Sequence, residues 1–401
     1  MKSKSIIDLL SNETITKFIG LHIKDDVKKL ALNANKYTGL DIKVLSTLIS
    51  LYQKAEIKLP EHYTAMAALN PKSYEQSTSE AVAKYKAGIM NIKNKHIINV
   101  TGGIGIDDWA MAQLAKKIDS CDMDEDIHIM SIYNISLFKT KNIERHLVDG
   151  IEFIKHSQKT DIIYADPDRR PNAARIFRLE DSEPDILKNM EILLDKADEV
   201  WLKISPMADI SYLQKVIPSI NNLYVIAWLG EVKEILLCCS KNKASKKNVF
   251  AVNIGSKETS VYQKTENTKP ASYCSDGLYL YEPNKSIIKA GLSADYANYC
   301  GLNMLSINSY FFISDHLKQD FFGRSFKIIE KLAYKPKEIK RYLEDTKIYK
   351  ANITTRNFRE TAETLKKRFK LNDGGIDYLC FTIDTENQSW LYHCIKNNEK
   401  Y

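Results

Sequence analysis

Ile97-Ile98-Asn99-Val100-Thr101-Gly102-Gly103-Ile104-Gly105-Ile106-Asp107-Asp108-Trp109-Ala110 is the stretch that decides the fold. It begins as a short apolar run, which is typical of a buried strand, and then breaks on three glycines. From Trp109 to Lys117 the residues follow a helical pattern. Glycine tolerates a positive φ and lets a ligand lie against the backbone, and the free amides of the next helix point toward such a ligand. The order strand, glycine turn, helix therefore predicts a ligand-binding loop.

The spacing of the glycines indicates which ligand the loop takes. No Lys follows Gly105, so a phosphate-binding loop is excluded, and Asp108 stands where a dinucleotide fingerprint needs its third glycine. The stretch resembles motif I of the class I S-adenosylmethionine (SAM) methyltransferases. More closely, it resembles the Thr-Gly-Gly-x-Gly-x-Asp version of bacterial methyltransferases with a THUMP-like C-terminal domain. The resemblance implies SAM as cofactor, held by Thr101, Gly102, Gly103, Gly105 and Asp107. A tight turn without a ligand is the alternative.

Length and composition set the outer limits of the prediction. A chain of 401 residues is expected to form two or three domains. No apolar run is long enough for a membrane span, and Asp8 comes too early for a signal peptide, so we expect a cytoplasmic protein. The seven Cys are scattered without a Cys-x-x-Cys pair, so we expect no metal and no disulfide framework. The formal charge of +7 permits a nucleic-acid partner.

Residues 1–93 are predicted to form an N-terminal helical domain. Asp41 is the expected N-cap of a long amphipathic helix that ends at Leu59-Pro60. Ser77-Thr78-Ser79-Glu80 matches a capping box, which places the start of another helix there. The stretch from Glu75 to Lys86 resembles the helix that precedes the sheet in the same methyltransferases, where it borders the cofactor and substrate cleft. A plain helical cap beside the sheet is the alternative.

Residues 94–270 are predicted to form a Rossmann-like α/β domain. Strand-like runs alternate with helical runs, which is typical of a mainly parallel sheet covered on both faces. Ligands of such sheets bind at the carboxyl ends of the strands. The predicted strands are Ile97–Val100, Ile127–Ile132, Asp161–Ala165, Val200–Ile204, Tyr224–Trp228, Ile235–Cys239 and Val249–Ile254.

Two further cofactor contacts are expected from the resemblance. In the family an acidic residue after the second strand binds the ribose hydroxyls. Residues 129–134, where we expect that strand to end, carry no carboxylate, so Ser131 or Asn134 would accept these bonds less strongly. Asp149 looks like the acidic residue that contacts the adenine amino group. It would equally serve as a helix N-cap, and both roles are compatible.

The acceptor site is predicted at Asp166-Pro167-Asp168-Arg169-Arg170, which follows an apolar strand. It stands at the motif IV position and resembles the Asp-Pro-x-Arg-Arg of the THUMP-like family. Proline stiffens the turn, so Asp166 and Pro167 are the expected catalytic residues. Arg169 and Arg170 could hold a phosphate of the substrate. The alternative is a strand-end turn with a local salt bridge. No Cys follows the motif, which argues against a cysteine nucleophile there and favours a nitrogen acceptor.

Lys203 lies within the apolar strand that precedes Ser205-Pro206-Met207. The segment resembles the family's Lys-Leu-Ser-Pro-Met-x-Asp-Ile. A buried ammonium needs a partner, so Lys203 is expected either to reach the substrate cleft or to extend to the surface. Glu231-Val232-Lys233-Glu234 resembles the family's Glu-Cys-Lys-Glu, and only strand pairing is predicted for it.

The C-terminal part is predicted to contain a ferredoxin-like module, residues 271–331, and a THUMP-like domain, residues 332–401. Tyr281-Glu282-Pro283-Asn284-Lys285 and Leu371-Asn372-Asp373-Gly374-Gly375 carry this resemblance. One long helix is expected over Lys285–Tyr299. The basic residues of this part suit an RNA backbone, although a solvated helix face would look the same. They are Lys337, Lys340, Arg341, Arg356, Arg359, Lys366, Lys367, Arg368 and Lys370.

Taken together, the motifs and the resemblance predict a SAM-dependent methyltransferase that acts on structured RNA, either tRNA or rRNA. Two alternatives stay open. The chain could be a non-catalytic RNA-binding module with a degenerate SAM pocket, or its acceptor could be a protein or a small molecule. We expect no membrane partner, and the sequence does not indicate the oligomeric state.

Overall fold

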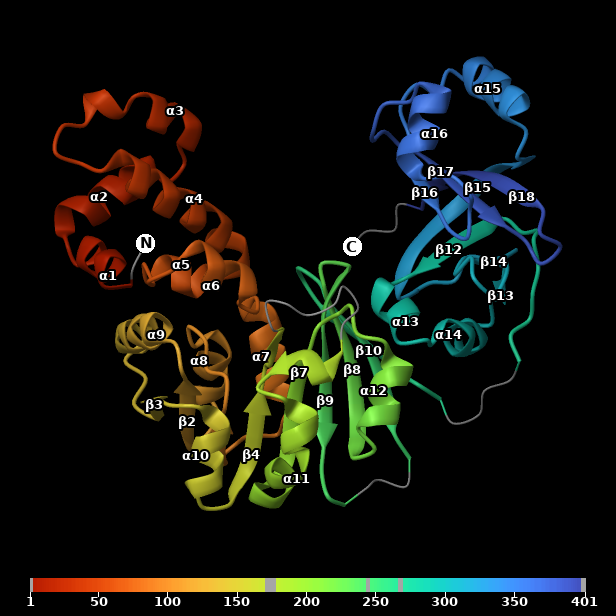
Figure 1. Ribbon diagram of the computed structural model, residues 1–401. Helices are drawn as coiled ribbons and strands as arrows, with labels where there is room; N and C mark the ends of the chain where they lie inside the picture. Colours follow the sequence, from red (N-terminus) through yellow and green to blue (C-terminus); the bar gives the residue numbers. More distant parts are fainter. Residues whose placement is uncertain (1–2, 170–177, 243–245, 266–269, 398–401) are drawn as a thin grey trace. The chain divides into compact units, whose positions relative to one another are not determined.

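A computed structural model describes residues 3–169, 178–242, 246–265 and 270–397 of the chain (Figure 1). Its Cα positions divide into two compact units. The first comprises residues 1–223 and 234–247, and the second comprises residues 224–233 and 248–401. In the described part of the chain, every helix is too short or too polar to span a lipid bilayer.

The first unit is built on a sheet whose strands follow the order β9-β7-β4-β1-β2-β3. β1, β2, β3, β4 and β7 are parallel, and β9 pairs antiparallel with β7. Parallel strands joined by helical crossovers confirm the predicted α/β class. The bounds are β1 (His96–Asn99), β2 (Lys117–Asp122), β3 (Ile143–Leu147), β4 (Thr160–Ala165), β7 (Ala197–Ile204) and β9 (Glu231–Cys239), of which residues 234–239 belong to this unit. A short pair, β5 (Asp168–Arg169) and β6 (Ser182–Glu183), follows β4.

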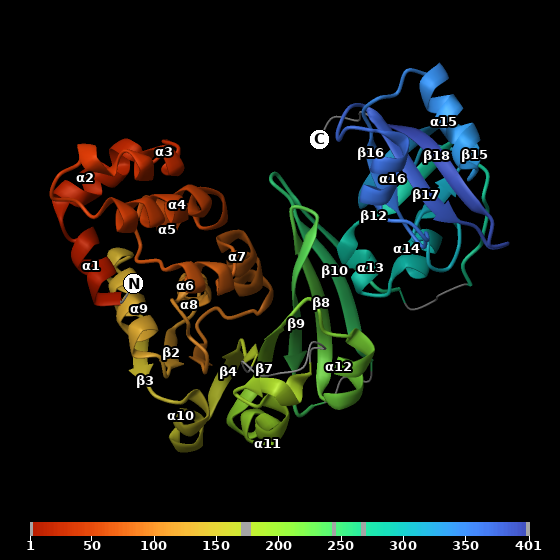
Figure 2. The same ribbon diagram turned by 45° about the horizontal axis from the view of Figure 1, so that its top comes forward.

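Helices cover both faces of this sheet (Figure 2). α10 and α11 lie side by side against one face, whereas α7, α8 and α9 lie against the other. Apolar side chains from both layers and from the strands between them form the core, as a sheet buried on both faces requires. The bounds are α8 (Ile106–Ala112), α9 (Glu125–Leu137), α10 (Gly150–His156), α11 (Ile186–Lys196) and α12 (Ile210–Val216).

The N-terminal residues are helical, as predicted, and α1 packs beside α9, where Ser3 N–H donates to Asp126 Oδ1 at 3.1 Å. Asp41 caps α4 by accepting the Val44 N–H, which confirms its predicted role. The predicted capping box is wrong, since the Ser77 hydroxyl donates to the Tyr74 carbonyl oxygen and Glu80 accepts the N–H groups that open α5. The bounds are α1 (Ser3–Leu10), α2 (Glu13–His22), α3 (Val27–Leu32), α4 (Ile42–Lys58), α5 (Pro60–Thr64), α6 (Pro71–Gln76) and α7 (Glu80–Ile89).

The predicted strand Ile127–Ile132 is wrong, because these residues lie in the helix α9. The second strand is β2, at residues that were expected to continue the preceding helix. β2 mixes polar and apolar residues, and its polar Asp119 and Ser120 are buried against partners from neighbouring strands. Hydrophobic periodicity cannot detect a strand whose buried positions are polar.

The second unit contains a sheet in the order β13-β14-β12-β15-β18-β17-β16. The predicted long helix over residues 285–299 is two helices, α13 and α14, because Gly291 interrupts it with a φ of +69°. The same unit holds β8 from residue 224 onward, β10 (Asn248–Ile254) and β11 (Thr259–Gln263); the whole of β8 is Ile220–Trp228. The other bounds are β12 (Tyr279–Pro283), β13 (Asn303–Met304), β14 (Phe312–Ser314), β15 (Gly323–Ala333), β16 (Asn352–Thr355), β17 (Asp377–Ile383), β18 (Ser389–Lys396), α13 (Lys285–Lys289), α14 (Ser293–Cys300), α15 (Pro336–Asp345) and α16 (Ala362–Phe369).

Several basic residues of the second unit make ion pairs. The buried Glu282 carboxylate on β12 accepts from Arg324 on β15 and from Arg356, which lies 2.7 Å away and follows β16. Arg368 pairs with Glu360 at 2.7 Å, and Lys366 pairs with Asp373. Three of the predicted basic residues, Arg356, Lys366 and Arg368, thus have acidic partners within the unit, so the predicted basic surface is smaller than the number of its lysines and arginines suggests.

Candidate active site

A cavity of about 570 Å³ opens in the first unit, at the carboxyl ends of the parallel strands. The structure brings together there most of the site residues predicted from the sequence. Those that line the cavity are Thr101, Gly102, Gly103, Gly105, Asp107, Asp149, Asp166 and Lys203. The wall on the side of the helical domain is completed by Lys72, Ser73, Gln76, Ser77 and Thr78. The last three belong to the stretch from Glu75 to Lys86 that was predicted beside the cleft.

The backbone angles and the close neighbours of the loop require glycine at several of its positions. Gly105 has a φ of +89° and Gly103 a φ of +51°, a conformation that residues with a Cβ rarely adopt. A Cβ on Gly102 would lie 2.0 Å from Arg145 Nη1 and 2.3 Å from Ser120 Oγ. On Gly103, in contrast, a Cβ would meet no atom within 4 Å. The loop is therefore packed tightly from behind at Gly102 and is open at Gly103.

Asp108 and Arg145 support the loop from behind. Asp108 accepts from Asn99 Nδ2 at 2.6 Å, from Ser120 Oγ at 2.5 Å and from Arg145 Nη1 at 3.3 Å. Arg145 is 2% exposed and also donates to the Gly103 carbonyl oxygen at 3.1 Å. Burial raises the pKa of the Asp108 carboxyl, although the Arg145 charge opposes this shift. These bonds connect three strands to the glycine loop and fix its shape.

The neighbouring residue Asp107 faces the cavity. Its Oδ1 lies 2.9 Å from Lys86 Nζ, and its Oδ2 accepts from Tyr164 Oη at 3.0 Å and from Thr78 Oγ1 at 3.2 Å. Burial alone would raise the pKa of this carboxyl, but the Lys86 and Lys203 ammonium groups and the hydrogen bonds lower it overall. Asp107 is therefore held as a carboxylate in the cavity wall.

Lys86 and Glu234 were not predicted as site residues. Lys86 Nζ lies 3.1 Å from Glu234 Oε1 and 2.9 Å from Tyr164 Oη, and both charged side chains are 2% exposed. Burial raises the pKa of Glu234, while Lys86 and Lys203 oppose the shift. A signal was present in the sequence, because Glu234 lies at the start of the apolar run Ile235–Cys239. A charge in such a run requires a buried partner, which one sequence alone does not identify.

Lys203 reaches the cavity, which is one of the two positions predicted for it. Its Nζ lies 2.5 Å from Asp166 Oδ2. Burial would lower the pKa of Lys203, but Asp166, Glu234 and Asp107 raise it well above its usual range. The Asp166 N–H donates to Thr101 Oγ1 at 2.6 Å, so the turn after β4 is bonded directly to the glycine loop. Asp166 is thus positioned from both its backbone and its side chain.

The expectation that no carboxylate follows the second strand is wrong, because that strand is β2 and it ends at Asp122. Asp122 lines the cavity, and its Oδ2 accepts the Gly103 N–H at 2.8 Å. Ser131, which was predicted to replace this carboxylate, is fully buried on α9. A Cβ on Gly105 would lie 3.0 Å from Ser131 Oγ, so Ser131 packs behind the loop. Asn134 instead bonds to the Ala68 backbone.

Asp149 is the N-cap of α10, where it accepts the N–H groups of Ile151 and Glu152. The same carboxylate lines the cavity, so the two readings of this residue are compatible in space. Gly150 follows it, and a Cβ there would lie 2.3 Å from the Val100 carbonyl oxygen. The start of α10 is therefore pressed against the end of β1, which keeps Asp149 beside the glycine loop.

The acceptor motif is described only in part. Asp168 lines the cavity and accepts from Gln76 Nε2 at 3.2 Å. Burial and the neighbouring Asp166 charge raise its pKa. The backbone of Arg169 pairs with Ser182 in the short β5–β6 ladder. Arg170 and the side chain of Arg169 lie outside the described residues, so their predicted role as phosphate ligands stays a prediction.

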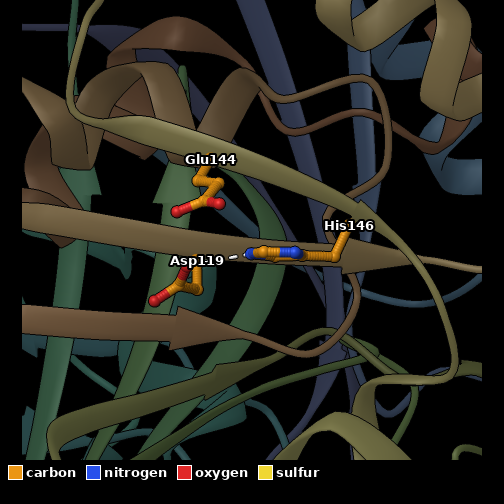
Figure 3. Close-up of side chains that lie close together, drawn as sticks. All are labelled: Asp119, Glu144 and His146. Carbon is orange, nitrogen blue, oxygen red and sulfur yellow. Dashed lines mark hydrogen bonds and ion pairs between the residues drawn. The ribbon is translucent and has the colours of Figure 1, made fainter.

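One group of side chains with metal-binding atoms occurs in the described ranges: Asp119, Glu144 and His146 (Figure 3). His146 Nε2 lies 2.9 Å from Asp119 Oδ1. The Lys117 ammonium lies 3.0 Å from both Asp119 and Glu144, so a protein cation already pairs with both carboxylates and offsets one of their two charges. None of the three side chains lines the cavity. The expectation of no metal stays a prediction.

Two segments of the chain match known domain families. Residues 279–321 match the model of a ferredoxin-like domain, and residues 323–396 match that of a THUMP domain-like family. The second unit therefore carries a ferredoxin-like and a THUMP-like domain, as predicted. The remaining predicted domain boundaries stay predictions.

Longer similarities cover both units. The chain is 22% identical over 304 residues to uncharacterised SAM-dependent methyltransferases from two strains of Mycobacterium tuberculosis, CDC 1551 and H37Rv, and the match covers 75% of this chain and 80% of theirs. The crystal structure of a candidate methyltransferase from Porphyromonas gingivalis W83 superposes with a TM-score of 0.82 at 25% identity. That match covers 99% of this chain and 100% of the other. The chain thus has a mixed α/β methyltransferase fold with a helical N-terminus.

Proposed function

We propose that this chain is a SAM-dependent methyltransferase whose acceptor is structured RNA. The observation that carries the first part is the cavity itself. It lies at the carboxyl ends of parallel strands, beside a glycine loop, in a chain similar to methyltransferases over nearly its whole length. Ligands of open α/β sheets bind at this edge, and the lining residues match those expected for a nucleoside with a charged tail.

The residues in the wall fit SAM. Asp122 has a carboxylate at the end of β2, and a carboxylate accepts two ribose O–H groups well. Asp149, after β3, is the contact for adenine that the resemblance implies. The open space above Gly103 allows a ligand to lie against the backbone. Asp107, on the other side of the loop, faces the cavity with a negative charge, which suits the cationic amino group of methionine.

Bound SAM supplies a methyl group on a cationic sulfonium, so the main task of the protein is to position the acceptor. In our proposal Asp166 orients the acceptor atom. Its backbone is fixed by Thr101 and its carboxylate by Lys203. Pro167 stiffens the turn that presents it. Asp168 lines the same cavity, and in our proposal it receives the proton that the acceptor nitrogen releases.

RNA as the acceptor is supported by the THUMP-like domain at residues 323–396. Lys337, Arg341, Lys367 and Lys370 are exposed on and beside α15 and α16. Exposed cations neutralise phosphates and release counterions, which is the main source of affinity for a nucleic-acid backbone. We propose a ring or exocyclic nitrogen of a tRNA or rRNA base as the methylated atom. The non-catalytic alternative loses its main support, because the second strand ends in a carboxylate, Asp122, where none was expected.

The test begins with calorimetry of S-adenosylhomocysteine (SAH) binding. We expect saturable binding, and no binding at millimolar ligand would remove the cofactor from the proposal. The full chain is then incubated with tritiated SAM and total RNA from a deletion strain, and the RNA is digested to nucleosides. Label in one modified nucleoside is expected. Label that appears only in protein or in a small molecule would replace RNA with that acceptor.

Asp166→Ala tests the role of the acceptor turn in the same assay. Losing one orienting or proton-transferring group typically lowers turnover on the order of 10²–10⁴-fold. SAH and RNA affinities should change little, because Asp166 is proposed to act on the acceptor atom. A loss of SAH affinity as large as the loss of turnover would assign Asp166 to the cofactor site instead.

A further inference from the structure

A buried ionic cluster lies behind the cavity wall. It joins Lys86 on α7, Asp107 on α8 and Glu234 on β9, with the Lys86 ammonium 2.9 Å from Asp107 and 3.1 Å from Glu234. Asp107 is 14% exposed and lines the cavity, whereas Glu234 is 2% exposed and lies behind it. One ammonium thus serves two carboxylates, only one of which a ligand can reach.

The charges around this cluster do not cancel. Lys203 is paired with Asp166 at 2.5 Å, which accounts for one cation and one anion. Lys86 is then left with two carboxylates, those of Asp107 and Glu234. If all five groups are ionised, they carry one surplus negative charge between them. Without Glu234, the Lys86 ammonium would neutralise Asp107 completely.

The strand order shows which part of a ligand meets that charge. Asp149 and Asp122 follow β3 and β2, at one end of the cavity, whereas Asp166 and Lys203 lie on the side of β4 and β7. With the nucleoside at Asp122 and Asp149, as proposed above, the amino-acid part of the cofactor extends past the loop after β1 toward Asp107. Its ammonium group is the cation that the surplus charge would attract.

We propose that Glu234 is a positioning residue, which shares the Lys86 ammonium and so leaves the Asp107 carboxylate available to pair with the amino group of the cofactor's methionine part. The inference rests on the proposed function, because it assumes that SAM occupies the cavity. It assigns a binding role to a residue that does not touch the cofactor.

Protonation of Glu234 would have the same effect as its removal. Burial raises the pKa of this carboxyl, and the groups that face it are Lys86, Lys203, Asp107 and the Tyr164 hydroxyl. As the pH falls toward this raised pKa, the surplus charge disappears. SAH affinity should then decrease in acid, while a ligand without the amino-acid part should bind equally well.

The experiment compares SAH with 5′-methylthioadenosine, which has the same nucleoside but no amino-acid part, by calorimetry on the full chain. In Glu234→Gln, SAH affinity should fall roughly tenfold or more, as losing a charge-assisted bond typically does. The affinity for methylthioadenosine should stay unchanged. Equal losses for both ligands would mean a merely structural role and would overturn the inference.

A second variant makes the charge argument testable even if the cluster is disturbed. Glu234→Gln combined with Lys86→Met removes one anion and one cation, so Asp107 again carries the surplus charge. We expect SAH affinity to recover toward that of the unchanged chain. A structural role predicts the opposite, because the double variant has lost more buried contacts than the single one. Absence of recovery in a folded double variant therefore counts against the proposal.

Glu80→Gln is the matched control. Glu80 is 1% exposed, so it is as buried as Glu234, but its carboxylate pairs with His62 at 2.7 Å and accepts the N–H groups of Glu61 and His62. This control should melt at a lower temperature and keep the ratio of the two affinities. If the unchanged chain binds neither ligand, the proposed cofactor fails and the inference with it. Binding of SAH with an unchanged ratio in Glu234→Gln rejects only the inference.

Discussion

Asp107 and Asp108 are neighbours in sequence, yet they belong to opposite sides of the glycine loop. Asp107 faces the cavity with Lys86, Tyr164 and Thr78 around it, and its pKa is lowered. Asp108 faces the interior with Asn99, Ser120 and Arg145, and burial raises its pKa. Adjacent residues of a helix point about 100° apart, which is enough to separate the two environments.

The difference between them separates ligand binding from support. The Asp108 carboxylate is fully buried and already accepts from Asn99, Ser120 and Arg145, so it can only fix the loop. The Asp107 side has ammonium groups on one face and a cavity on the other, so its carboxylate can gain a further partner. A ligand-binding loop in this chain therefore depends on two ionic clusters, of which only one is expected to respond to the ligand.

The largest effect that distinguishes the two sides is expected from Asp108→Asn. The change leaves Arg145 buried without a full countercharge, and breaking a buried pair typically costs about 3–5 kcal/mol. Urea unfolding measures this cost, with Asp107→Asn as the matched variant. Asp107→Asn should cost less, because Lys86 keeps Glu234 as a partner. A loss below about 1 kcal/mol in Asp108→Asn, the level of an exposed pair, would show that Asp108 is already neutral.

Alanine at the glycines tests the same boundary without removing a charge. Gly102→Ala would push a Cβ into Arg145 and Ser120, and overpacking typically costs about 1–3 kcal/mol. Gly103→Ala meets open space and adds only the strain of a positive φ, roughly 1–2 kcal/mol at most. SAH affinity should fall in both, and Gly103→Ala should lower the melting temperature less than Gly102→Ala does. If Gly102→Ala is the better tolerated of the two, Arg145 can move and the loop is not fixed from behind.

The two aspartates should affect the pH dependence of the free energy of unfolding in opposite directions. A carboxyl with a lowered folded pKa stabilises above its ordinary value and loses this contribution as the pH falls through the folded pKa. Asp107 is such a group, whereas Asp108, with a raised pKa, loses its contribution as the pH rises. In Asp107→Asn the free energy of unfolding should therefore fall less steeply as the pH is lowered. In Asp108→Asn it should fall more steeply. Urea unfolding between about pH 3.5 and 7 checks both slopes, and equal slopes would contradict the assigned directions.

The smallest effect is expected at the surface of the same region. Lys84 on α7 pairs with Glu61 at 2.5 Å, but both side chains are about half exposed. Exposed pairs are typically worth roughly 0.2–1 kcal/mol and are screened by salt. Lys84→Ala should change the melting temperature little and leave SAH affinity unchanged. A larger loss would mean that the cation–π contact of Lys84 with Trp109 matters more than the ion pair.

The sequence predicts the parts of this site that lie within continuous apolar strands. β1, β4 and β7 are such strands, so the glycine loop, Asp166 and Lys203 were placed at the right edge of the sheet. β2 is not predicted because two of its buried residues are polar, and Asp122, the carboxylate at its end, is missed with it. The same mistake explains Ser131. It is predicted as a ligand only because Ile127–Ile132 is predicted as a strand.

Lys86 and Glu234 were missed for a different reason. Each has an ordinary local pattern, a lysine in a helix and a glutamate at the start of a strand. Their role depends on a contact between two residues that lie 148 positions apart in the sequence. Periodicity and spacing describe local structure, and they carry no information about which distant side chains meet.

The pairing of β15 decides whether the ferredoxin-like and THUMP-like domains can be separated from each other. The ferredoxin-like match ends at residue 321 and the THUMP-like match begins at 323, yet β15 pairs with β12 of the first segment and with β18 of the second. A cut after Phe322 would strip β12 of one neighbour and leave an open sheet edge, which favours aggregation. The two named modules therefore form one cooperative folding unit. A recombination event, or an expression experiment, that separates them should produce neither half in a folded state.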